Sequence, residues 1–149
     1  MTSEMGLLAV EEARLWIGTP YRHQGSKRGA GADCLGLLRG VWRALYGSEP
    51  EEVPAYTQDW SEPQREETLW RAAKRHLIEK DATAAAEGDV ILFRMRDHSV
   101  AKHLGLQAKL GFDASFIHAY SGHGVVESPL SAPWERRIVA RFAFPERIQ

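Results

Sequence analysis

Hydrophobic positions in the first half of the chain recur with the spacing of an α-helix. Residues 4–17 show this pattern weakly, and residues 34–46 show it strongly, because their apolar side chains fall on one stripe. The stripe consists of Cys34, Leu37, Leu38, Val41, Trp42 and Leu45. A third helix is expected over residues 63–80, with Pro63 in its first turn.

Turn-forming residues separate these predicted helices. Residues 18–32 contain four glycines and a proline, and residues 48–62 are rich in proline and glutamate, so both segments are expected to be loops. Asp33 is a favourable N-cap for the helix that follows it, and Gly47 is a favourable residue at which that helix can end.

The second half of the chain changes to the alternating pattern of β-strands. Residues 102–108 place Leu104 and Leu106 on one face and His103 on the other. Further strands are expected at residues 90–93, 116–120, 125–127 and 137–144. Because helices come first and closely connected strands follow, we predict an α+β fold with a mostly antiparallel sheet. Residues 1–149 are expected to form a single domain.

Composition and charge narrow the possible partners. Apolar residues make up 44% of the chain and charged residues 26%, as in ordinary globular proteins. The net charge of -1 argues against binding to nucleic acid or to an anionic membrane. No apolar run approaches the roughly 20 residues that a membrane span needs. Glu11 and Glu12 interrupt the N-terminal apolar stretch, so no secretory signal is expected. We therefore expect synthesis in the cytoplasm and another route for any export.

Cys34, the only cysteine, stands at the first position of the second predicted helix. Unpaired backbone N–H groups and the positive end of the helix dipole stabilise a thiolate there. We therefore expect a lowered thiol pKa and rapid alkylation near neutral pH. The thiolate is the attacking form of cysteine, so this placement indicates nucleophilic catalysis.

Two histidines occupy neighbouring predicted strands. His103 and His118 both lie in alternating segments, and facing residues of paired antiparallel strands are about 5 Å apart. If the helix that carries Cys34 packs on this sheet, the three side chains form a nucleophile, a base and a group that orients the base. Such a set performs acyl transfer.

Other interpretations of these residues exist. A lone cysteine on an apolar stripe is commonly a small core residue, and a histidine on a strand is commonly structural. A metal site would need ligand spacings that are absent here, such as His-Glu-x-x-His or paired cysteines. The glycines at 29 and 31 lead into Asp33, whose charge would repel phosphate. No metal or other cofactor is therefore expected.

With these residues in view, the chain resembles the NlpC family of cell-wall peptidases, which are papain-like cysteine hydrolases. The resemblance spans nearly the whole chain and rests on segments that follow the family's order. They are Gly18-Thr19-Pro20-Tyr21, Gly31-Ala32-Asp33-Cys34-Leu35-Gly36-Leu37, Gly88-Asp89-Val90-Ile91-Leu92-Phe93, His103-Leu104-Gly105 and Ile117-His118-Ala119. The resemblance implies a papain-like fold in which the nucleophile helix packs on an antiparallel sheet.

The resemblance also implies a role for each site residue. Cys34 would be the nucleophile, His103 the general base and His118 the residue that orients it. Tyr21 would help form the oxyanion hole with the backbone N–H of Cys34, and Asp33 would help hold the free amino end of a stem peptide. The implied substrate is a peptidoglycan stem peptide, cut between the γ-carboxyl of D-glutamate and a diamino acid.

Two positions near the expected substrate pocket depart from the family pattern. Leu35 stands where the family often has serine, and the usual glycine pair before the nucleophile is reduced to Gly25-Ser26. The peptide specificity is therefore left open, whereas the reaction type is not affected.

More narrowly, the chain is similar to the branch of this family found with phage tails and gene-transfer-agent particles. The segments that carry this similarity are Tyr21-Arg22-His23-Gln24-Gly25-Ser26, Asp59-Trp60, Phe93-Arg94-Met95 and Pro133-Trp134-Glu135-Arg136-Arg137. This similarity implies tail proteins as partners and delivery to the cell wall by a virion-like particle.

Two other function classes stay open at this stage. The chain could be a structural or adaptor component of a tail tip with an inactive site, docking through acidic residues 49–52 and through Tyr56, Trp60 and Trp134. It could also be a thiol acyltransferase, because the same triad supports that chemistry. The pattern also leaves open whether the predicted loop 48–62 covers the cleft.

Overall fold

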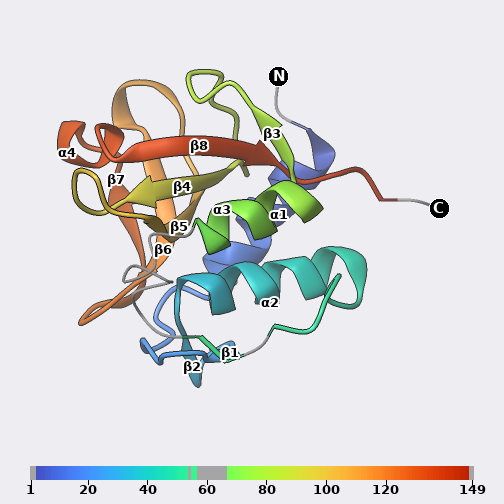
Figure 1. Cartoon of the computed structure of the whole chain (residues 1–149). Helices are drawn as coiled ribbons and strands as arrows, with labels where there is room; N and C mark the ends of the chain where they lie inside the picture. The colour runs from blue at the N-terminus through green and yellow to red at the C-terminus, as the bar shows by residue number, and fades with distance from the viewer. Residues whose placement is uncertain (1–2, 54, 57–66, 148–149) are drawn as a thin grey trace.

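The computed structural model describes residues 3–53, 55–56 and 67–147, and the fold is α+β, as predicted. The helices are α1 (Glu4–Leu15), α2 (Cys34–Tyr46), α3 (Thr68–His76) and α4 (Ala132–Glu135). The main sheet consists of β3 (Ile78–Lys80), β4 (Val90–Arg94), β5 (Ala101–Gln107), β6 (Ser115–Tyr120), β7 (Gly124–Pro129) and β8 (Ile138–Ala143). Its strand order is β3-β8-β4-β5-β6-β7, and these neighbours pair antiparallel (Figure 1).

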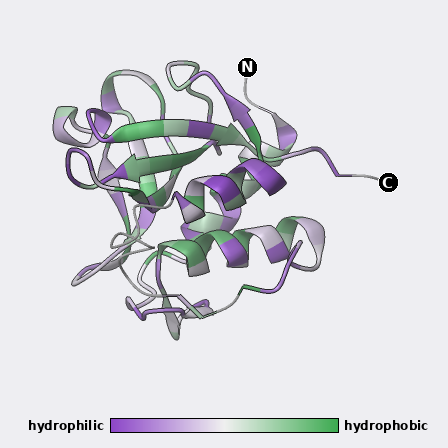
Figure 2. Cartoon of the chain, viewed as in Figure 1, coloured by the Kyte–Doolittle hydropathy of each residue, from purple (hydrophilic) through white to green (hydrophobic). Residues whose placement is uncertain are grey.

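The sheet has a different apolar cluster on each of its faces. The larger core lies between the sheet and helices α1, α2 and α3, and it contains the apolar stripe predicted for α2. Its most buried members include Ala9, Ala13, Leu37, Val41, Leu104, Leu106, Ile117 and Phe142. On the opposite face, Ile91, Phe93 and Phe116 form a small cluster that Trp134 of α4 covers. Figure 2 shows the resulting pattern, with strands β4 and β8 coloured largely as hydrophobic and helix α3 largely as hydrophilic.

The predicted third helix is wrong at its C-terminal end. Residues 63–66 lie outside the described residues, and the described helix α3 ends at His76. Residues 78–80 form the edge strand β3 instead, which pairs with β8 from Ile78↔Ala143 to Lys80↔Arg141. Pairing with a sheet edge overrides the helical spacing here, because helix propensity is a weak preference that tertiary contacts outweigh.

The glycine-rich segment 18–32, predicted as a loop, contains a small hairpin. Strands β1 (Ser26–Lys27) and β2 (Gly31–Ala32) pair antiparallel, and Tyr21 forms an isolated bridge with Ala32. The hairpin is too short to produce an alternating pattern, so the sequence carried no strand signal for it. Only part of the predicted loop 48–62 lies within the described residues.

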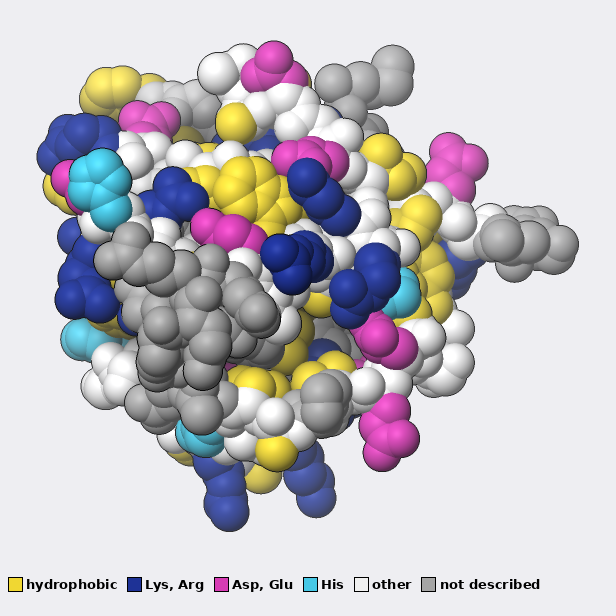
Figure 3. Space-filling model, in the orientation of Figure 1, with side chains coloured by type: hydrophobic (Ala, Val, Ile, Leu, Met, Phe, Trp, Pro, Cys, Tyr) yellow, Lys and Arg dark blue, Asp and Glu magenta, His cyan; other side chains and the backbone are white. Residues whose placement is uncertain are grey.

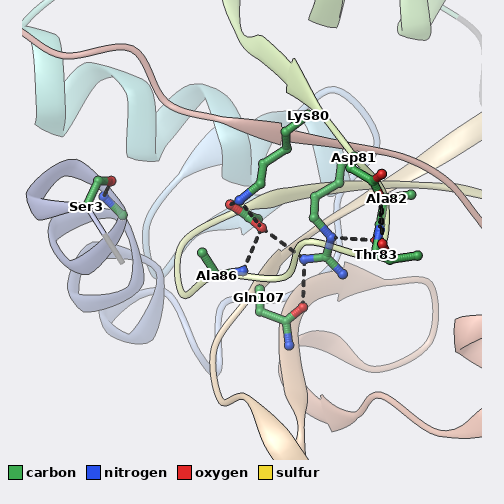
Figure 4. A network of polar contacts seen from close by, with 10 residues as sticks. Ser3, Lys80, Asp81, Ala82, Thr83, Ala86 and Gln107 are labelled. Atoms are coloured by element: carbon green, nitrogen blue, oxygen red, sulfur yellow. Dashed lines mark hydrogen bonds and ion pairs between the residues drawn. The ribbon is translucent and has the colours of Figure 1, made fainter. Parts of the chain in front are cut away.

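A buried polar network joins the ends of three strands far from Cys34 in the sequence. Arg141 Nη1 donates to Asp89 Oδ2 at 3.1 Å and to Gln107 Oε1 at 2.9 Å. Asp89 also accepts from Lys80 Nζ and from the backbone N–H of Ala86 (Figure 4). Because Arg141, Asp89 and Gln107 are all buried, the charges and amides need these partners to offset desolvation. The network therefore holds the start of β4, the end of β5 and the C-terminal part of β8 in fixed positions relative to one another.

Charges of both signs are mixed over the α3 face of the molecule. Lys74 pairs with Glu79, and Arg75 pairs with Glu51. Figure 3 shows acidic side chains among the lysines and arginines on this face, in keeping with the net charge of -1. None of the helices in the described ranges is long and apolar enough to cross a membrane.

Candidate active site

Cys34 opens helix α2, as the sequence predicted. Asp33 is the N-cap, and its Oδ1 accepts from the backbone N–H of Gly36 at 2.7 Å. A side chain at position 36 would collide with the loop, since an added Cβ would lie 1.6 Å from the carbonyl oxygen of Gly25. Glycine at 36 therefore lets the loop that precedes the helix pack directly on its first turn.

The sulfur of Cys34 lies against strand β5 at a point where β5 is no longer paired with β6. Strands β5 and β6 pair only at Leu106↔Ile117 and Gln107↔Phe116. Beyond this point the backbone of β5 is free to meet the thiol, and Cys34 Sγ lies 3.9 Å from the carbonyl oxygen of Lys102. The N–H of Leu104 also acts on the sulfur. The thiol thus contacts the backbone on both sides of His103.

His103 and His118 are in direct contact. His103 Nε2 and His118 Nδ1 are 2.7 Å apart, and the two rings meet edge to face. Continuing the strand register places Gly105, not His103, opposite His118, so the two imidazoles are diagonal neighbours on one face of the sheet. Gly105 makes room for this arrangement, because an added Cβ would lie 2.7 Å from Phe116 Cδ2 and 3.4 Å from His118 Cβ.

A fourth polar residue, Ser128 of β7, completes this line of side chains. Its Oγ is 2.9 Å from His118 Nε2, so both ring nitrogens of His118 have partners. Sequence reasoning missed Ser128, because a serine in a strand carries no motif. A signal was present, however: β6 and β7 form a hairpin in which Ser128 pairs with Phe116, and the alternation of side chains then places Ser128 on the face of His118.

Aromatic rings enclose the imidazole pair. The ring centroid of Trp134 lies 5.7 Å from that of His103 and 5.2 Å from that of His118. Phe93 and Phe116 pack against the same pair. Trp134, which the adaptor interpretation assigned to docking, is therefore part of the wall around the site. The predicted "polar" face of β5 is in fact buried beneath this wall.

Burial keeps both reacting groups neutral. It lowers the pKa of His103 to about 3 and, with the charge of His123 in a smaller role, the pKa of His118 to about 4. Burial, followed by the negative charge of Asp33, raises the pKa of Cys34 to about 12. The expected lowering of the thiol pKa is therefore wrong. The N–H groups of the helix start do favour the thiolate, but desolvation of a side chain only 8% exposed outweighs them.

Tyr21 lies beside the nucleophile. Burial and then the charges of Cys34 and Asp33 raise its pKa to about 12, which keeps the hydroxyl protonated. The structure gives no intramolecular hydrogen bond to this hydroxyl within the described part of the chain, and the side chain is half-buried. A phenol of this kind can donate to an oxygen of a bound substrate.

Asp33 is engaged by the chain itself. Besides Gly36, it accepts from the backbone N–H of Gln24 at 2.7 Å and from the hydroxyl of Tyr56 at 2.6 Å, both through Oδ2. Only 3% of the residue is exposed. Tyr56, another residue assigned to docking, therefore lies next to the site, and its carbonyl oxygen accepts from Gln24 Nε2. The predicted role of Asp33 in holding a substrate amine stays a prediction.

Trp60, which the adaptor interpretation assigned to docking, and two further histidines, His76 and His98, are not among the residues that the structure brings to the site. Trp60 falls in the part of the chain that is not described. His76 bonds to Glu51, and His98 is exposed in a turn. Over the described ranges, no three His, Cys, Asp or Glu side chains are grouped as metal ligands would be.

The geometry supports nucleophilic acyl transfer. A thiol at a helix start adjoins the strand of a neutral imidazole, and a second imidazole orients that base. The Tyr21 hydroxyl lies near this sulfur, and backbone N–H groups at the start of α2 act on it.

Comparison with known proteins gives a consistent result. The sequence model described as "NlpC/P60 family" matches residues 18–142. The search of curated proteins finds no match. Among solved structures, a lipoprotein-like NLP/P60 family protein from Staphylococcus aureus subsp. aureus Mu50 is 19% identical, with a TM-score of 0.63, over 99% of this chain and 43% of that one.

Two further structures show the same fold. An NlpC/P60 family protein from Bacillus cereus ATCC 10987 is 21% identical, with a TM-score of 0.61, over 95% of this chain and 40% of that one. NlpC2 from Trichomonas vaginalis is 21% identical, with a TM-score of 0.63, over 97% of this chain and 48% of that one. The chain thus spans less than half the length of each of these proteins.

Proposed function

The chain belongs to the NlpC/P60 family, and we propose that it is a cysteine peptidase that hydrolyses peptidoglycan stem peptides at the bond between γ-D-glutamate and a diamino acid. The observation that carries this proposal is the contact of Cys34 with β5 on both sides of His103, together with the 2.7 Å contact of His103 with His118. A structural cysteine would not need a buried pair of imidazoles on the strands that its sulfur contacts.

The reaction begins from a neutral pair. His103 Nε2 is taken by His118, which leaves Nδ1 for the thiol. As the Sγ–C bond forms at the substrate carbonyl, the thiol proton moves to Nδ1 and the carbonyl π electrons move to oxygen. Collapse of this intermediate breaks the C–N bond, and the leaving amine takes the proton from His103. Water, activated by the same imidazole, then hydrolyses the thioester and regenerates the thiol.

The oxyanion is stabilised by groups that are already in place. The backbone N–H of Cys34 belongs to the unpaired first turn of α2, and the Tyr21 hydroxyl stays protonated because its pKa is raised to about 12. Such preorganised donors stabilise a tetrahedral intermediate by roughly 3 kcal/mol each in well-studied acyl transfer enzymes.

The test uses defined stem peptides and mass spectrometry of the products. Cys34→Ala, His103→Ala and His118→Ala should each abolish cleavage while the far-UV circular dichroism is retained. His98→Asn is the matched control, since His98 is exposed and has a positive φ that asparagine tolerates, and it should cleave normally. Undiminished cleavage by Cys34→Ala would refute the proposal.

Delivery by a phage or gene-transfer-agent tail is the second part of the proposal. Its support is the sequence similarity of the described segments 21–26, 93–95 and 133–137 to that branch. These three segments contribute Tyr21, Phe93 and Trp134 to the surroundings of the candidate site. Immunogold labelling of purified particles should place the protein at the tail, and its absence from particles that contain all other tail proteins would refute delivery.

The alternative is an inactive adaptor in a tail tip. A buried thiol with a raised pKa is the one observation that favours it. The stem-peptide assay distinguishes the two functions, because an adaptor cleaves nothing at any pH. Particle assembly would still require the adaptor.

A further inference from the structure

Ser128 stands at the end of a hydrogen-bonded line that starts at the base. The line runs from His103 Nε2 to His118 Nδ1 at 2.7 Å, and from His118 Nε2 to Ser128 Oγ at 2.9 Å. His118 is fully buried between its two partners. Each neutral imidazole carries one proton on one nitrogen, so the position of one proton determines the positions of the others.

Only two arrangements of protons satisfy both contacts. In the first, His118 carries its proton on Nε2 and donates to Ser128, while His103 carries its proton on Nε2 and donates to His118. His103 Nδ1 is then an acceptor and can take the thiol proton. In the second, Ser128 donates to His118 Nε2, and both histidines carry their protons on Nδ1. His103 Nδ1 is then already protonated and cannot act as a base.

We propose that Ser128 is a positioning residue that selects the first arrangement by accepting the proton of His118. The predicted effect on cleavage rests on the proposed function, whereas the predicted protonation of the two histidines does not. Ser128 can accept because it is only half-buried and borders an open cavity of about 610 Å³, which leaves its hydroxyl proton free to bond to solvent. Arg14, Lys109, Glu127 and Ser131 line the same cavity.

The carboxylate of the adjacent residue, Glu127, does not compete for the hydroxyl of Ser128. Glu127 precedes Ser128 in β7, and successive side chains of a strand point to opposite faces. Glu127 instead accepts from Ser115 Oγ at 2.6 Å and pairs with Arg14. The acceptor role of Ser128 toward His118 is thus left undisturbed.

The cavity also suits substitution, because a change at Ser128 leaves no sealed void. Ser128→Thr keeps the hydroxyl, and Ser128→Val has nearly the same shape as threonine without it. Both residues favour strands. Ser128→Ala removes the hydroxyl at a half-buried position, where water can take its place. Ser131→Ala is the control, because Ser131 lines the same cavity and its side chain makes no cap hydrogen bond.

The primary measurement is the protonation of the ring nitrogens by long-range ¹H–¹⁵N NMR of histidine-labelled protein at pH 7. The wild type and Ser128→Thr should show the Nε2-protonated form for both His103 and His118. Ser128→Val should shift both to the Nδ1-protonated form, because a buried N–H without an acceptor costs more than a lone pair without a donor. Nδ1 protonation in the wild type, or an unchanged spectrum in Ser128→Val, would overturn the inference.

The second measurement is cleavage of the defined stem peptide. Ser128→Val should lower kcat by roughly tenfold or more with KM unchanged, since the wrong tautomer removes the base and not the binding site. Ser128→Ala should lose less, and Ser128→Thr should be close to the wild type. Equal kcat for the threonine and valine variants would contradict the inference. If the wild type cleaves nothing, the proposed function fails, and the NMR result still decides the role of Ser128.

Discussion

The reactivity of Cys34 is the sharpest test of the site's electrostatics. The perturbation is the transfer of this single thiol from the folded protein to the unfolded chain in urea, probed with iodoacetamide. Only the thiolate is alkylated at a useful rate. The folded environment raises the pKa of Cys34 to about 12, because the sulfur is desolvated and faces the charge of Asp33. The unfolded thiol has a pKa of about 8.5.

The size of the effect follows from the two thiolate fractions. At pH 7 the fraction is about 10⁻⁵ for a pKa of about 12 and about 3% for a pKa of about 8.5. Alkylation should therefore be about 3,000-fold slower in the folded state. The limited exposure of Cys34 adds a steric factor in the same direction.

The assay follows the mass increase of the intact protein at a series of pH values. Because the chain has one cysteine, the denatured sample is a control on the same residue. The folded rate should rise tenfold per pH unit up to about pH 10, whereas the denatured rate should level off near pH 9. A folded rate within tenfold of the denatured rate at pH 7, or a plateau below pH 9, would refute the neutral thiol. It would instead support a thiolate that the N–H groups of the helix start stabilise.

Three further predictions concern stability. Burial lowers the pKa of His103 to about 3 and that of His118 to about 4, so the unfolded chain binds two protons that the fold excludes; as the pH drops below about 6.5, stability should fall with a slope that approaches about 2.7 kcal/mol per unit, and an unchanged Tm between pH 7 and 5 would contradict this. Gly105→Ala should cost about 1–3 kcal/mol in urea titrations and abolish cleavage, because its Cβ would collide with Phe116 and displace the imidazoles; an unchanged midpoint would show that the site relaxes freely. Asp89→Asn leaves the buried charge of Arg141 without its counter-charge, so it should cost about 3–5 kcal/mol and lower the Tm by about 10 °C in calorimetry. Adding Arg141→Met to Asp89→Asn should restore part of that loss, whereas additive losses would contradict the pairing.

Where the sequence succeeded, the relevant signal was local. The bounds of α2 agree with those predicted, since a periodic stripe, an Asp N-cap and a Gly stop all coincide there. Local patterns of apolar residues located strands β4 to β8 to within two residues, but they did not predict β3. The third helix was predicted too long, because short stretches near a sheet edge satisfy either period.

In the candidate site too, local signals predicted some residues and tertiary contacts decided the others. Its three central side chains could be named from the sequence, because a cysteine at a helix start and two histidines on alternating strands are properties of single segments. Ser128, Trp134 and Tyr56 could not be placed in the same way. Each reaches the site through strand pairing or loop packing between segments that are distant in the chain.

The sequence by itself determined which backbone segments are helical or extended, and which residues those segments present at their ends and faces, because these properties depend on neighbours a few positions away. Only the tertiary structure decided the ionisation of the site. The N–H groups that favour the thiolate all belong to the first turn of one helix. The free energy of desolvation, in contrast, depends on every segment that packs around the sulfur. In this fold the second term is larger, and it leaves Cys34 and its base neutral until a substrate arrives.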